Sequence, residues 1–185
     1  PVDAPYRLRD MAADAAGLLD ALDIERAHVA GASMGGMIAQ AMAIEFPARV
    51  LSLTSIMSTT GNPNLPPAKP EAMSVLLEPL PTTRDEGIAR AVSVFRTIGS
   101  PGFPFDEAEV RERAALSYDR GFNPGGVARQ LVAILASGSR KEARAYWVQV
   151  ADDPTADEET RAAAQMALAE MQFEDRDYEG ALERY

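Results

Sequence analysis

The chain has 185 residues, 46% of them hydrophobic, with no cysteine, one histidine and a formal net charge of −10 at pH 7. This length and apolar content are typical of one ordinary domain, or of a domain with an appendage, and exclude wholesale disorder. The lack of cysteine excludes disulfides and cysteine-bound metals, and the acidic balance argues against nucleic acid as a partner. A single histidine and the lack of an EF-hand pattern lead us to expect no metal and no other cofactor.

We expect neither a membrane span nor a signal peptide. Its apolar runs are far shorter than the roughly 20 residues that cross a bilayer, so we expect no membrane association. The chain starts at Pro1 without a basic and apolar leader, which predicts no signal peptide and a cytoplasmic location. A start without methionine indicates a fragment or a processed product.

The first part of the chain predicts a βαβ unit. Residues 10–22 have apolar side chains at helical spacing, and residues 27–30 form a short apolar strand. A helix over residues 37–46 should end before Pro47, since proline cannot continue it. Residues 50–56 are rich in β-favouring types and predict a second buried strand. Two strands joined by a helix are parallel as a rule.

A helical block follows. Residues 58–70 are dense in proline, glycine, asparagine and serine, which indicates a loop leaving the sheet. Four helical stretches come after it: residues 71–78, residues 85–98, a stretch ending near Tyr118, and a stretch after Pro124 that reaches Leu135. Helices inserted after a βαβ unit suggest a cap over one edge of the sheet.

Two of these helices carry capping signals at their start. Thr83 and Glu86 have the spacing of a capping box, in which each side chain bonds the backbone of the other residue. Asp106 and Glu109 are candidate capping residues of the next helix.

Between the first strand and the next helix lies Gly31-Ala32-Ser33-Met34-Gly35, followed by Gly36. Gly-x-Ser-x-Gly after a strand and before a helix is the context of a nucleophile elbow. The elbow would expose the Ser33 hydroxyl at the tip of the turn and let the Met34 amide face an oxyanion. The same turn could also serve only for tight packing or anion binding.

With these motifs, residues 6–138 resemble the middle of an α/β-hydrolase, and are similar to bacterial esterases of the aclacinomycin methylesterase type. The similarity lies in YRLRDMAADAAGLLDAL, HVAGASMGGMIAQAMAIEFPARV and GVARQLVAILASG. It implies hydrolysis of small, apolar carboxylic esters. It also implies five site residues: Ser33 as nucleophile, Met34 as an oxyanion-hole amide, and Gly31, Gly35 and Gly36 as elbow-shaping residues.

The family's remaining catalytic parts have no counterpart in this sequence. A complete member has strands before the first helix, a loop with a second oxyanion amide, and strands after the cap that carry an acid and a histidine. The one histidine, His28, precedes Ser33 by five residues, or roughly 16 Å of extended chain. A base must come within about 3 Å of the hydroxyl. We therefore expect His28 to be a structural strand residue and the chain alone to be weakly active or inactive.

The last part of the chain differs in character. Residues 139–185 are rich in alanine and glutamate, hold much of the acidic excess and lack a strand signal. The segment LAEMQFEDRDYEGALERY resembles tetratricopeptide repeat helices, although fewer than two repeats are covered. A plain helical hairpin is the alternative. If repeat-like, this tail would bind a peptide or a helix of a protein partner.

Together these observations predict a helix-dominated α/β protein in three parts: a partial α/β-hydrolase core at 1–58, a helical cap at 59–138 and a tetratricopeptide-like tail at 139–185. A serine hydrolase segment is the first functional hypothesis. The alternatives are a non-catalytic interaction module acting through the acidic tail, and a fused or truncated piece without a function of its own. Because two strands leave exposed edges at residues 50–56, we expect a homo-oligomer or a marginally stable monomer.

Overall fold

The computed structural model describes residues 3–65 and 67–140. It divides into two compact units. The core unit comprises residues 3–65 and 129–140 of the described chain, and the helical unit comprises residues 67–128. Nearly all of the tetratricopeptide-like tail lies outside the described residues, so its prediction stays a prediction.

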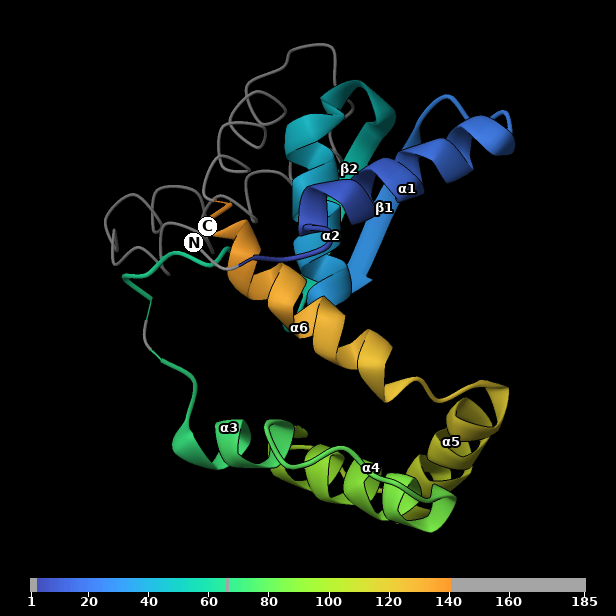
Figure 1. Ribbon diagram of the computed structural model, residues 1–185, viewed down its shortest axis with the longest axis vertical. Helices are drawn as coiled ribbons and strands as arrows, with labels where there is room; N and C mark the ends of the chain where they lie inside the picture. Colours follow the sequence, from blue (N-terminus) through green and yellow to red (C-terminus); the bar gives the residue numbers. More distant parts are fainter. Residues whose placement is uncertain (1–2, 66, 141–185) are drawn as a thin grey trace. The chain divides into compact units, whose positions relative to one another are not determined.

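The core unit contains the expected βαβ arrangement (Figure 1). Helix α1 (Leu8–Ala21) is followed by strand β1 (Ala27–Ala32), helix α2 (Met34–Glu45), the short 3-10 helix η1 (Pro47–Arg49) and strand β2 (Val50–Ile56). The two strands pair in parallel, and the prediction of a small parallel sheet is confirmed.

The sheet register sets which residues lie beside one another at the end of the strands. Ala27 is paired with Val50 at the start of the strands, and Ala32 is paired with Ile56 at their end. Strand β1 runs two residues further than expected, and α2 begins at Met34, three residues before the expected Met37. A single residue, Ser33, therefore separates the strand from the helix.

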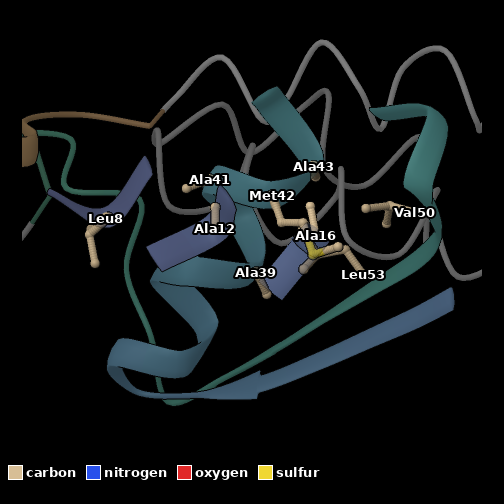
Figure 2. Close-up of a cluster of buried hydrophobic side chains, with 9 residues drawn as sticks. All are labelled: Leu8, Ala12, Ala16, Ala39, Ala41, Met42, Ala43, Val50 and Leu53. Carbon is tan, nitrogen blue, oxygen red and sulfur yellow. The ribbon is translucent and has the colours of Figure 1, made fainter. Parts of the chain in front are cut away.

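The core lies between α1, α2 and β2, where Figure 2 labels its nine buried side chains. Alanine predominates on the two facing helices, and its small side chain lets their backbones approach closely. From β2, the side chains of Val50 and Leu53 belong to this core. Along β1 the residues alternate between half-buried and exposed, so in the described chain one side of this strand packs on the core and the other is open.

The helical unit holds α3 (Pro70–Leu76), α4 (Arg84–Ile98) and α5 (Glu107–Arg120), as the sequence pattern predicts. Both capping signals are confirmed. The Thr83 hydroxyl accepts from the Glu86 amide at 3.3 Å, and the Thr83 amide donates to the Glu86 carboxylate at 3.2 Å. The Asp106 carboxylate accepts from the Glu109 amide at 3.0 Å.

Helix α6 (Pro124–Ser137) begins in the helical unit, and its residues 129–137 belong to the core unit. Ala133 is fully buried and Ile134 packs against the core. The Ser137 hydroxyl accepts from the Leu8 amide at 2.9 Å, which fastens the end of α6 to the start of α1. Within the described ranges, no helix is long and apolar enough to cross a membrane.

Candidate active site

Ser33 occupies the turn between β1 and α2 in a backbone conformation that is unusual for serine. Its φ is 53° and its ψ is −120°, and it is the N-cap residue of α2. A positive φ in a residue with a Cβ is uncommon, costs on the order of 1–3 kcal/mol, and persists only where the surroundings enforce it. Ser33 is exposed to solvent. The turn thus presents a hydroxyl at its tip while straining the backbone beneath it.

Three hydrogen bonds hold the backbone of Ser33 in this conformation. Its amide donates to the Ile56 carbonyl at 2.8 Å, which attaches it to the end of β2. Its carbonyl accepts from the Ser58 hydroxyl at 2.8 Å and from the Met37 amide at 3.2 Å. Because both backbone polar groups of Ser33 are engaged, the position of its Cβ is fixed by the end of β2 and the first turn of α2.

The glycines of the turn differ in what they contribute. A Cβ on Gly31 would overlap the carbonyl group of Gly35 and lie 2.6 Å from the Gly36 nitrogen. A Cβ on Gly36 would lie 2.7 Å from the Ser58 Cβ and 2.8 Å from the Ser55 hydroxyl. A Cβ on Gly35 would meet nothing within 4 Å. Neighbouring atoms therefore leave no space for a side chain at Gly31 and Gly36. Gly35 instead supplies the backbone against which Gly31 packs.

Met34 is the first residue of α2. The first amides of a helix have no acceptor within the helix, and they lie at the positive end of its dipole. An amide beside a nucleophilic serine is chemically suited to donate to an oxygen that gains negative charge on the carbonyl under attack. The position of Met34 is compatible with that role.

His28 is engaged elsewhere on the sheet. Its ring Nδ1 lies 2.8 Å from the Ser52 hydroxyl, the residue paired with it across the strands. Ser33 bonds the backbone of Ile56, four residues further along β2, which corresponds to roughly 13 Å. The structure therefore does not bring His28 and Ser33 together.

A polar cluster near the turn that holds Ser33 was not anticipated from the sequence. Its buried members are Gln40 and Arg140, each 5% exposed, and Thr60 at 7%. The Ser55 hydroxyl accepts from the Gln40 side chain, and the Ser58 hydroxyl donates to the Ser33 carbonyl. Burial lowers the pKa of the Arg140 guanidinium by desolvation. One indication of this cluster was present in the sequence, the single polar residue Gln40 within an apolar helix run. Nothing in the sequence pattern linked Gln40 to Arg140, which lies 100 positions away.

Known proteins match this chain over much of its length. A family model described as alpha/beta hydrolase fold matches residues 1–166. Rhodomycin D methylesterase DauP of Streptomyces sp. (strain C5) is 31% identical over 132 residues, and rhodomycin D methylesterase DnrP of Streptomyces peucetius is 30% identical over the same length. A 2-hydroxy-6-oxononadienedioate/2-hydroxy-6-oxononatrienedioate hydrolase of Paraburkholderia xenovorans (strain LB400) is 54% identical over 48 residues, which cover 26% of this chain and 17% of that protein.

The two methylesterase matches cover 61% of this chain and 44% of each relative, so the chain spans less than half the length of these relatives. The family match, by contrast, extends over most of the chain. The predicted resemblance to this family is confirmed, and the chain belongs to the α/β-hydrolase fold family.

Proposed function

We propose that Ser33 is the nucleophile of a site that hydrolyses carboxylic esters. The observation that carries this proposal is the backbone of Ser33, held at a φ of 53° between a parallel strand and the start of a helix. In this fold family, a serine on such a turn is the expected place for a nucleophile. Two of the relatives are named as methylesterases, which favours esters as the substrate class.

The chemistry follows from the positions of two groups. The Ser33 hydroxyl oxygen attacks the ester carbonyl carbon, and its proton passes to a general base. The Met34 amide donates to the resulting oxyanion, the alcohol leaves, and water then releases the acid from the acyl-serine. We propose small and fairly apolar esters as substrates, in keeping with the resemblance.

The general base is not His28, the one histidine of this sequence. Its Nδ1 bonds Ser52, and it lies at the opposite end of β1 from Ser33. Loss of triad members reduces the rate of serine proteases by several orders of magnitude. We therefore propose that these 185 residues alone are weakly active or inactive, and that a second chain or a longer form supplies the acid, the histidine and the second oxyanion donor.

Covalent labelling with a fluorophosphonate tests the role of Ser33, because the probe reports a reactive serine without requiring turnover. Imidazole in solution should replace the absent base, since its pKa near neutrality suits proton transfer. We expect slow labelling that imidazole accelerates and that Ser33→Ala removes. Ser74→Ala, at an exposed position of α3, is the matched control and should label like the parent chain. Equal labelling of the parent chain and of folded Ser33→Ala would refute the proposal.

A further inference from the structure

Arg140 is a buried cation held by neutral groups of three segments of the core unit. The residue is 5% exposed. Its Nε donates to the Gln40 side-chain oxygen at 3.1 Å, one terminal nitrogen donates to the Gly138 carbonyl at 3.0 Å, and the other to the Thr59 carbonyl at 2.9 Å. Burying a charge is costly unless its hydrogen bonds are well made. The fixed fork of a guanidinium can satisfy three such acceptors at once, which an ammonium group cannot do in the same geometry.

These bonds fix the loop that follows β2. The Arg140 amide also donates to the Thr60 carbonyl at 2.7 Å, so backbone and side chain hold neighbouring residues of the loop. The next residue, Gly61, has a φ of 75°, and a Cβ there would lie 2.9 Å from the Gly138 carbonyl oxygen. The loop and the chain around Arg140 are therefore in close backbone contact.

From this loop and from Gln40, two paths of contacts lead to the elbow. In the first, the residue before Thr59 is Ser58, whose hydroxyl donates to the Ser33 carbonyl at 2.8 Å. In the second, the Gln40 amide group donates to the Ser55 hydroxyl at 3.1 Å. Ser55 and Ser58 both lie against Gly36 in the first turn of α2. Ser55 and Ser58 thus lie against the first turn of α2, and they are linked to Arg140 only through Gln40 and the adjoining Thr59.

We propose that Arg140 is a positioning residue for Ser33, which acts by holding Ser58 where it bonds the Ser33 carbonyl. This inference rests on the proposed role of Ser33 as nucleophile. A displacement of about 1 Å in a reacting group can reduce a rate by up to a hundredfold. Any substitution that removes the guanidinium of Arg140 should therefore shift the Ser33 backbone and, with it, the position of the Ser33 hydroxyl.

The test is a double-mutant cycle on the full chain between Arg140→Lys and Ser58→Ala, with two readouts. The first is the imidazole-assisted rate of fluorophosphonate labelling at Ser33, per folded molecule. The second is hydrogen exchange at the Ser33 and Met37 amides, which bond the Ile56 and Ser33 carbonyls. Arg113→Lys, at an exposed residue of α5, is the control.

We expect each single variant to slow labelling by about tenfold or more and to speed exchange at both amides, with the double variant no worse than either single. The control should match the parent. Additive effects of the two substitutions, an unchanged Arg140→Lys variant, or exchange that rises equally in α1 would overturn the positioning role. If the parent chain shows no Ser33 labelling, the proposed nucleophile is refuted, and the exchange data alone decide whether Arg140 positions the elbow.

Discussion

The backbones of Gly31 and Gly35 are in direct contact across the turn, so that a Cβ on Gly31 would overlap the Gly35 carbonyl group. Gly31 is the residue before the last one of β1, and Gly35 lies in the first turn of α2. Their contact is what allows strand and helix to be joined by Ser33 alone.

Gly31→Ala should therefore destabilise the protein. The new methyl group would overlap backbone atoms, which cannot move aside as the end of a flexible side chain can. Overpacking of this kind lowers the free energy of unfolding by about 1–3 kcal/mol or more. Gly35→Ala is the matched control. Its Cβ would meet nothing within 4 Å, and replacing a helical glycine is worth about 0.4–1 kcal/mol of added stability. Urea unfolding of the two variants tests this difference in stability. Equal unfolding midpoints would contradict the close contact between Gly31 and Gly35.

Substitution of His28 should leave the reactivity of Ser33 unchanged. His28→Gln removes a ring that bonds the Ser52 hydroxyl, at an exposed position far along β1 from Ser33. The loss of stability should be about 1 kcal/mol or less, since one hydrogen bond contributes about that much. Labelling rates of the parent and of His28→Gln, measured with and without imidazole, are the check. A large drop confined to the imidazole-free reaction would mean that His28 does act as the base.

The capping box at the start of α4 should contribute measurably to the stability of the helical unit. Thr83→Ala removes the hydroxyl that accepts the Glu86 amide, and loss of such a cap costs about 1 kcal/mol. Thr97→Ala serves as control, because its hydroxyl bonds the Ser93 carbonyl within the same helix instead of capping it. Hydrogen exchange in α4 should rise for Thr83→Ala and change little for Thr97→Ala.

The same helix start should be sensitive to acid. Hydrogen bonds from the Thr82 amide, the Thr82 hydroxyl and the Thr83 amide lower the pKa of the Glu86 carboxyl below its ordinary 4.5. A carboxyl whose pKa is lower in the folded than in the unfolded state stabilises the fold above the unfolded value. That contribution is lost as the pH falls through the lowered pKa.

Exchange in α4 should therefore accelerate, after correction for its intrinsic pH dependence, as the pH falls below the ordinary pKa of a glutamate carboxyl. Glu86→Gln should reduce this acceleration, because glutamine does not titrate. Glu112→Gln, at an exposed position of α5, should leave it in place. An identical pH response in all three proteins would show that Glu86 is not the group responsible.

Local signals made much of this fold predictable. The residues from Val50 to Ile56 form β2 with the expected bounds, and Thr83 and Asp106 cap their helices, because strand preference and capping depend on neighbours in the sequence. The turn between β1 and α2 was predictable for the same reason, since Gly31, Ser33 and Gly35 lie within a few residues.

The parts that sequence reasoning missed depend on long-range contacts. Periodicity placed a helix after Pro124 but could not show that its second half belongs to the core unit, where Ala133 is buried and Ile134 packs against the core. The contact between Arg140 and Gln40 joins residues 100 positions apart, and no local pattern encodes it. The strained φ of Ser33 likewise results from the Gly31–Gly35 contact and the bond to Ile56, which only the folded chain brings together.

The most direct test of the central claim is to locate a fluorophosphonate adduct by peptide mass spectrometry in the full 185-residue chain, with and without imidazole. The account predicts an adduct on Ser33 that forms slowly alone and markedly faster with imidazole. A folded sample that gains no adduct at Ser33 under either condition would contradict the role of Ser33. Rapid labelling of Ser33 without imidazole would instead contradict the claim that its base is missing.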